Sequence, residues 1–176
     1  MPLTEVYLGL GSNIERERHL CAGLDALAGF LEGMTCSAVF ESQPVGIKSG
    51  PFFNLVVAAK THLPLIELSR RLKLIEADNG RYAPDRKGLP LDIDVLFYGD
   101  LVGDFEFLTL PRAEILKNAF VLWPLSLMAP DKVHPGVGKT LAQMWAEAQI
   151  DQVLAPVAFE WRGVQLTPAE MLERSV

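Results

Sequence analysis

The chain has 176 residues, of which 49% are hydrophobic and 22% are charged, a composition typical of a globular protein with a substantial core. Its formal net charge of −6 argues against a function that depends on non-specific attraction to nucleic acid. No apolar run reaches the length of a membrane span, and the first residues do not form a secretory signal, so we expect a cytoplasmic protein with no membrane partner. The two cysteines, Cys21 and Cys36, are expected to be free thiols in a reducing compartment.

The first half of the chain alternates between strand and helix patterns. Leu20, Leu24 and Leu27 recur at helical spacing and predict an amphipathic helix. The preceding segment from Gly9 to Asn13 lacks the residues of a dinucleotide-binding loop or a P-loop, and it indicates a tight turn between a strand and this helix. In chain order we expect a strand over 6–10, a helix over about 16–31, strands over 35–42 and 52–61, and a helix from about 64 to 78.

The stretch from Leu91 to Tyr98 carries the clearest chemical signal, because its side chains alternate with the period of a strand. Asp92 and Asp94 fall on one face, where two carboxylates repel each other unless a cation compensates them. The other face is expected to hold Leu91, Ile93, Val95 and Phe97. Mg²⁺ is the natural candidate, since it often joins one or two carboxylates to substrate phosphates. These residues alone also allow a solvated strand face with two ordinary acids.

Two long unpatterned loops, over 43–51 and 81–90, flank the predicted strands, and such loops often carry function. The second loop holds Arg81, Arg86 and Lys87 and leads directly into the aspartate strand, which favours a site for a metal-bound polyphosphate. A solvated basic loop is the other interpretation. Asn54 is a polar residue in an apolar strand, so it is either a binding group or an amide satisfied by its neighbours.

The last third of the chain has weaker patterns. The apolar run from Phe120 to Leu125 must be buried, but its periodicity does not separate helix from strand. Capping-box matches at Thr140–Gln143 and Thr167–Glu170 predict that a helix begins at each position. The segment over 152–161 is a candidate extra strand.

These motifs, taken in order, resemble those of the 6-hydroxymethyl-7,8-dihydropterin pyrophosphokinase family of folate biosynthesis. The residues that carry the resemblance are Tyr7–Asn13, Ser42–Gly46, Phe52–Asn54, Ile75–Glu76, Gly80–Arg81, Leu91–Gly99, Leu110–Pro111, Phe120–Leu125 and Ala129–Pro130. Each motif is weak by itself, but the ordered set is specific and spans roughly 6–148. We therefore expect one domain over 1–176, in which 150–176 form a C-terminal extension that the resemblance does not cover.

The resemblance implies a ferredoxin-like α+β fold, with an antiparallel sheet flanked by helices. It implies ATP-dependent transfer of pyrophosphate to the hydroxymethyl group of 6-hydroxymethyl-7,8-dihydropterin, with release of AMP and with two Mg²⁺ ions between the phosphates. The expected partners are ATP and the reduced pterin alcohol, with no nucleic acid, in a monomer or weak dimer. Loops over 11–17, 45–51 and 82–90 match those that close over the substrates.

The resemblance also assigns roles to individual residues. Asp92 and Asp94 match the two metal-binding aspartates, and with Arg81 and Arg112 they form the expected catalytic set. The positions that match the pterin site are Ser42, Val45, Phe52, Asn54 and Phe120. The positions expected around the nucleotide and its phosphates are Glu76, Arg81, Lys87, Thr109, Arg112 and Lys117.

The chain departs from the family pattern where it usually has charged residues. Leu89 replaces an arginine three residues before Asp92, and the other replacements are Ala83, Arg112 and Asn118. Unless Arg86, Lys87 or Lys117 supplies the missing phosphate contact, we expect chemistry slowed by roughly 10²–10³-fold. Two alternatives stay open: a pterin- or nucleotide-binding paralogue with an altered substrate or no kinase activity, and an unrelated metal-dependent phosphohydrolase.

Overall fold

The computed structural model describes residues 2–43, 50–105 and 107–173. The helices and strands alternate in the first half of the chain, as predicted. The elements are β1 (Thr4–Ser12), α1 (Arg16–Ala28), β2 (Glu32–Cys36), β3 (Val39–Ser42), β4 (Phe52–Thr61), α2 (Leu65–Asp78), β5 (Asp92–Tyr98), β6 (Gly103–Phe105), β7 (Leu108–Leu110), the 3₁₀ helix η1 (Ala113–Leu116), α3 (Ala119–Met128), α4 (Leu141–Glu147), β8 (Leu154–Val157), β9 (Glu160–Trp161), β10 (Val164–Gln165) and α5 (Ala169–Glu173).

The main sheet has the strand order β5-β1-β4-β3-β8, and β2 also pairs with β4. All of these pairings are antiparallel. Helix α1 follows the first strand and α2 precedes β5, which gives the β-α-β-β-α-β order of a ferredoxin-like fold. This arrangement places β1 and β4 at the centre, where both faces of the sheet are covered.

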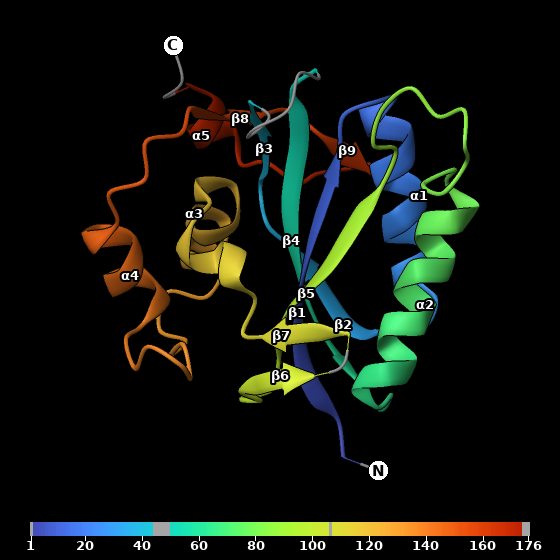
Figure 1. Cartoon of the computed structure of the whole chain (residues 1–176). Helices are drawn as coiled ribbons and strands as arrows, with labels where there is room; N and C mark the ends of the chain where they lie inside the picture. Colours follow the sequence, from blue (N-terminus) through green and yellow to red (C-terminus); the bar gives the residue numbers. More distant parts are fainter. Residues whose placement is uncertain (1, 44–49, 106, 174–176) are drawn as a thin grey trace.

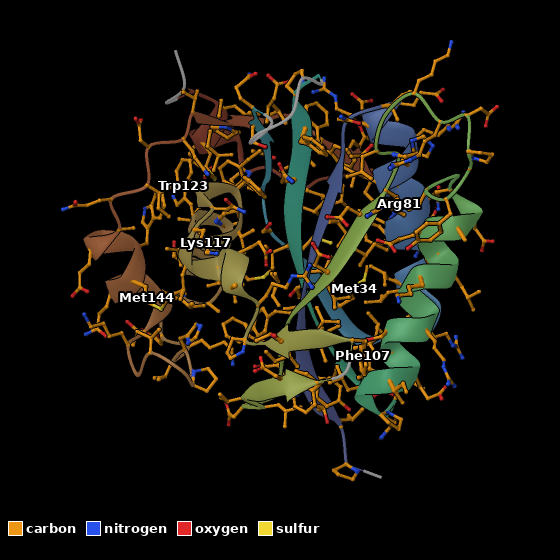
Figure 2. All side chains as sticks on the ribbon, in the orientation of Figure 1. Met34, Arg81, Phe107, Lys117, Trp123 and Met144 are labelled. Atoms are coloured by element: carbon orange, nitrogen blue, oxygen red, sulfur yellow. The ribbon has the colours of Figure 1, made fainter. Side chains whose placement is uncertain are left out.

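Each face of the sheet has its own hydrophobic core, and Figure 1 shows α1 and α2 on one side of the sheet with α3 and α4 on the other. Leu8 and Ile93 belong to the core under α1 and α2, together with Leu24 and Leu72. The core under α3 and α4 includes Val56, Leu96, Leu122 and Leu141. Helices α3 and α4 also pack on each other through Trp123 and Trp145, whose rings stack at 5.7 Å between centroids. Figure 2 labels Trp123 on α3 and Met144 on the neighbouring α4.

Strand β5 departs from the expected alternation near its end. Tyr7 pairs with Phe97, whereas Leu8 pairs with Val95, so Leu96 is an extra residue in β5. Such a bulge changes the side-chain alternation beyond it. Phe97 therefore lies in the core under α3, and our prediction that it shares a face with Val95 is wrong.

Two element boundaries also differ from the prediction. Helix α1 ends at Ala28, before the expected limit near 31, because Glu32 already pairs with Lys60 of β4. The single strand expected over 35–42 is split at Ser37, whose side chain accepts a hydrogen bond from Val56 N at 2.8 Å. A side-chain contact therefore interrupts the strand pairing at this position.

In the last third of the chain, the structure shows which elements the weak sequence patterns form. The apolar run after Phe120 forms helix α3, which is hydrophobic on most sides because it lies between the sheet and α4. Thr140 and Gln143 form the predicted capping box. Thr167 instead uses its hydroxyl to accept from Val39 N and to donate to Val157 O. None of the described helices is both long and apolar enough to cross a membrane.

Candidate active site

The two aspartates of β5 lie beside two glycines of β1. Asp92 is opposite Gly11, and Asp94 is opposite Gly9. Strand β1 continues through Ser12, so the tight turn expected from Gly9 onward is wrong. The glycines have no side chains to fill the sheet face beside the carboxylates, and a Cβ added at Gly11 would lie 2.9 Å from Asn54 Nδ2. Their role is therefore to leave space in front of the strand.

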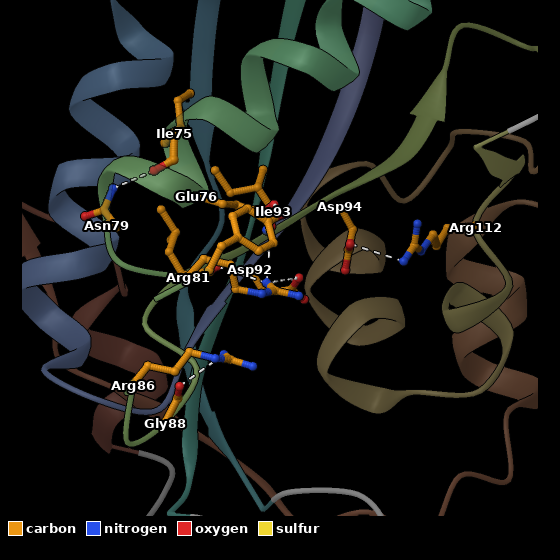
Figure 3. Close-up of polar contacts among 12 residues, drawn as sticks. Ile75, Glu76, Asn79, Arg81, Arg86, Gly88, Asp92, Ile93, Asp94 and Arg112 are labelled. Carbon is orange, nitrogen blue, oxygen red and sulfur yellow. Dashed lines mark hydrogen bonds and ion pairs between the residues drawn. The ribbon is translucent and has the colours of Figure 1, made fainter. Parts of the chain in front are cut away.

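Each aspartate is paired with an arginine from a different part of the chain. Arg81 Nη1 lies 2.9 Å from Asp92 Oδ1, and Arg112 Nη2 lies 3.1 Å from Asp94 Oδ1. Figure 3 shows Arg81 and Arg112 reaching the aspartate strand from opposite sides. The expected catalytic set of four residues is therefore gathered in one place.

The aspartate pair is electrostatically crowded. Burial, and then the charge of Asp92, raises the pKa of Asp94 to about 8, although Arg112 acts in the opposite direction. The described residues contain no group of three or more histidine, cysteine, aspartate or glutamate side chains that could hold a metal. A crowded pair of carboxylates nevertheless suits Mg²⁺, which usually keeps several waters and adds phosphate oxygens as ligands.

Glu76 fixes the aspartate strand to helix α2. Its Oε2 accepts a hydrogen bond from Ile93 N at 2.9 Å and lies 3.3 Å from Arg81 Nη1. Its Oε1 accepts from the Tyr82 hydroxyl at 2.7 Å. Glu76 is 5% exposed, so this buried carboxylate is fully engaged by the protein. These contacts hold Asp92 and Arg81 in register with each other.

The expected pterin residues meet on β3, β4 and α3. The Ser42 hydroxyl donates to Asn54 Oδ1 at 2.6 Å, and both side chains are buried. The amide of Asn54 is therefore held in a fixed orientation, with Nδ2 beside Gly11. Phe52 and Phe120 are partly exposed aromatic side chains. Val45 lies outside the described residues.

Two cavities flank the row of aspartates and arginines. One cavity, of about 310 Å³, extends toward Asn54 and Phe120. The other, of about 220 Å³, extends toward Ser69, Tyr82 and Phe107. The residues that line both cavities are Arg81, Asp92, Asp94 and Arg112. These four residues, here called the charged row, therefore border two cavities, and two small molecules could reach them.

The sequence matches the family described as 7,8-dihydro-6-hydroxymethylpterin-pyrophosphokinase (HPPK) over residues 7–130. The chain belongs to this family. A 2-amino-4-hydroxy-6-hydroxymethyldihydropteridine pyrophosphokinase of Aquifex aeolicus is 35% identical over 148 residues, which cover 82% of this chain and 92% of the relative. The Pseudomonas aeruginosa protein of the same description is 33% identical over 156 residues, which cover 86% of this chain and 96% of the relative.

Solved structures of Plasmodium falciparum HPPK-DHPS share the fold. The wild-type protein with pteroate has a TM-score of 0.69 at 14% identity, and the match covers 83% of this chain and 44% of that chain. This chain thus spans less than half of the length of those longer proteins. The likeness confirms the predicted HPPK fold.

The remaining residues predicted to contact the nucleotide or its phosphates lie outside the two cavities. Lys87 and Lys117 are exposed, and Figure 2 shows Lys117 beside α3. Thr109 is exposed on β7, where its hydroxyl donates to Asp104 Oδ1 at 2.8 Å. Arg86 Nη1 donates to Gly88 O at 3.1 Å. None of these four residues lines either of the two cavities described above.

Sequence patterns missed four contributors to this HPPK site. Gly9 and Gly11 lie in the segment for which we expect a turn, and Tyr82 has no predicted role beyond its place in the loop over 82–90. Glu114, whose Oε2 accepts from Arg112 Nε at 2.9 Å, holds the arginine that pairs with Asp94. A signal existed only for the glycines, because glycine inside a strand pattern often marks a close approach of another group.

Proposed function

We propose that this HPPK family member transfers pyrophosphate from ATP to the hydroxymethyl oxygen of 6-hydroxymethyl-7,8-dihydropterin and releases AMP. The observation that carries the proposal is the charged row shared by two cavities, one of which reaches Asn54 and Phe120. Transfer between two substrates requires a common meeting point for the acceptor oxygen and the phosphates. The row of two aspartates and two arginines supplies that point.

In the proposed reaction the pterin alcohol oxygen attacks the β-phosphorus of ATP. The new oxygen–phosphorus bond forms as the bond from the α–β bridging oxygen to the β-phosphorus breaks, and that oxygen leaves with AMP. The hydroxyl proton is lost to solvent or to a phosphate oxygen. Phosphoryl-type transfer depends mainly on position and charge, so we assign no side chain as an obligatory base.

We assign Asp92 and Asp94 to hold Mg²⁺, of which two ions are expected from the family resemblance. When bound, the metal neutralises charge on the phosphates and orients them. The surroundings of Asp94 support this assignment, since burial first, and then the nearby charge of Asp92, raise its pKa to about 8. A divalent cation would relieve the crowding of the two carboxylates.

We propose that Arg81 and Arg112 bind phosphate oxygens during turnover. Both guanidinium groups line both cavities, and Arg112 is 30% exposed at its side chain. Guanidinium groups suit this task because they donate several hydrogen bonds in a fixed plane. Glu76 then acts by holding Arg81, while Lys87, Thr109 and Lys117 remain predicted contacts of the nucleotide.

We propose that the pterin ring lies against Phe120 and Phe52, with the Asn54 amide on its edge. Asn54 Oδ1 already accepts from Ser42, so Nδ2 is the group that we assign to the substrate. Aromatic stacking and one fixed amide would select a flat heterocycle with polar edges. Val45 is still proposed to contact the pterin through its backbone.

The deciding experiment is an assay of AMP release with ATP, Mg²⁺ and 6-hydroxymethyl-7,8-dihydropterin. We expect pterin-dependent AMP formation by the wild-type chain and none by the double variant Asp92→Ala with Asp94→Ala. Full turnover by that variant would overturn the metal assignment. Release of phosphate or pyrophosphate without a pterin would instead support a phosphohydrolase.

A pterin-binding paralogue without kinase activity is the second candidate, and the character of Leu89 favours it. Its backbone is bound to Asn13, and its apolar side chain cannot supply the charge that the family usually has there. Calorimetry separates the two functions, since tight pterin binding without Mg-ATP binding would support the paralogue. A cytoplasmic location and a monomeric or weakly dimeric state remain predictions.

A further inference from the structure

We propose that Gln152, in the C-terminal segment after the family match, is a positioning residue that sets Phe120 for the pterin substrate. This inference rests on the proposed pterin site. Gln152 Oε1 accepts a hydrogen bond from Ala119 N at 2.7 Å, and Gln152 Nε2 donates to Asn118 Oδ1 at 3.1 Å. One side chain thus binds the two residues directly before Phe120.

The contacts of Gln152 complete the start of helix α3. The first N–H groups of a helix have no partner inside the helix. Asn118 precedes α3, but its side chain forms no capping hydrogen bond, because its oxygen accepts from Gln152. Gln152 therefore supplies the missing acceptor for Ala119 from outside the helix. Phe120, the next residue, depends on this contact for its position.

The same segment also holds the other side of the proposed pterin site. Strand β8 pairs with β3, and Leu154 lies opposite Ser42. Ser42 in turn orients Asn54 through its hydroxyl. Residues only two positions apart, Gln152 and Leu154, therefore fix the helix of Phe120 and the strand of Ser42.

A cavity of about 280 Å³ separates these two sides. It is lined by Ser42, Gln43, Phe120 and the four consecutive residues Asp151–Leu154. Phe120 also lines the cavity that contains the charged row. The C-terminal segment thus borders a space that Phe120 also lines, so a loss of the Gln152 contacts would leave Phe120 room to move.

Removal of both hydrogen bonds should weaken pterin binding without changing the chemical step. Gln152→Leu keeps much of the side-chain volume but leaves Ala119 N without its acceptor, and we expect the KM for the pterin to rise about tenfold. Because stacking acts on substrate and transition state alike, kcat should stay within about twofold. The KM for ATP should not change. Gln152→Glu keeps an acceptor for Ala119 N and should restore most of the pterin affinity.

Gln165→Ala is the matched control, because Gln165 Oε1 also accepts a backbone hydrogen bond, from Phe159 N at 2.6 Å, in the same C-terminal segment. Gln165 lines none of the three cavities described above. We expect it to leave the pterin KM unchanged. An equal rise in both variants would overturn the proposal in favour of general destabilisation, and so would an unchanged KM in Gln152→Leu.

Amide exchange and pterin calorimetry on the full chain keep this test separate from the proposed activity. Gln152→Leu should speed exchange at Ala119 and weaken pterin binding even if ATP is not turned over. Absence of AMP formation by the wild-type chain would overturn the proposed function alone. Unchanged exchange and pterin affinity in the variant would overturn the role of Gln152 alone.

Discussion

Asn13 and Leu89 bind each other through two hydrogen bonds that join the loop after β1 to the loop before β5. Asn13 N donates to Leu89 O at 3.1 Å, and Leu89 N donates to Asn13 Oδ1 at 2.6 Å. Both loops are predicted to close over the substrates. The residue that replaces the usual arginine therefore has a role through its backbone.

Asn13→Ala should loosen this junction. The variant leaves Leu89 N–H without its acceptor, which costs about 1–3 kcal/mol locally if the group stays buried. We expect faster amide exchange at Leu89 and about a tenfold lower kcat/KM for AMP formation. Asn13→Asp keeps an acceptor and is the control. Unchanged exchange in Asn13→Ala would show that the loops are held by other contacts.

Asp94→Asn should lower the activity without lowering the stability of the protein. Loss of one charged contact to the reacting phosphates should lower kcat by roughly 10²–10³-fold. The thermal midpoint in a chelator should not fall, because the substitution removes a charge that is disfavoured first by burial and then by Asp92, and the amide oxygen can still accept from Arg112. Exposed Asp100, at the turn after β5, offers the control Asp100→Asn. Wild-type activity together with a lower midpoint would make Asp94 a structural residue.

Periodic segments were predictable, whereas contacts that depend on distant residues were not. The strand over 52–61 agrees with the pattern because it is an apolar run buried on both faces, and the start of α1 at Arg16 agrees because burial on one face imposes the helical period. The bulge at Leu96 has no such signal, because it arises from the pairing of β5 with β1. The single-domain organisation stays a prediction, which the pairing of β8 with β3 supports.

The charged row also combines a feature that the sequence predicts with contacts that only the fold determines. Sequence spacing placed Asp92 and Asp94 on one face, and the structure agrees. The pairing of Arg112 with Asp94 follows only from the fold, because β6, β7 and the turn into η1 return the chain to β5, where Arg112 N donates to Leu96 O at 3.0 Å. Gln152 reaches Ala119 from 33 residues away, beyond any local pattern.

Ser69→Ala should stabilise the protein. Among the described residues, Ser69 Oγ is the only buried side-chain oxygen or nitrogen without a hydrogen-bond partner. Its removal, with the higher helix propensity of alanine in α2, should add about 0.5–1.5 kcal/mol to the free energy of unfolding. Ser126→Ala is the matched control, because the Ser126 hydroxyl in α3 donates to Trp123 O at 2.7 Å. Urea unfolding of both variants tests this, and a destabilised Ser69→Ala would reveal an unseen partner for the hydroxyl.

Protonation of His134 should lower the free energy of unfolding at acid pH. The ring is 4% exposed, and Nδ1 accepts hydrogen bonds from Gly136 N and Val137 N, both at 3.1 Å. Burial lowers the pKa of His134 below 6.5, so the unfolded chain takes up a proton before the folded chain does. The contribution to stability is therefore present above pH 6.5 and is lost as the pH falls through the folded-state pKa, at up to about 1.4 kcal/mol per pH unit.

His134→Asn retains a side-chain acceptor but does not titrate, so the difference in unfolding free energy between wild type and variant should shrink as the pH falls below about 6.5. Comparison with the variant cancels the titration of the remaining carboxyl and imidazole groups, provided that each pH uses the same ionic strength. Urea unfolding between about pH 5 and 8 measures this difference. Parallel pH profiles would mean that His134 takes up its proton equally in both states, and that its two backbone contacts tolerate the charged ring.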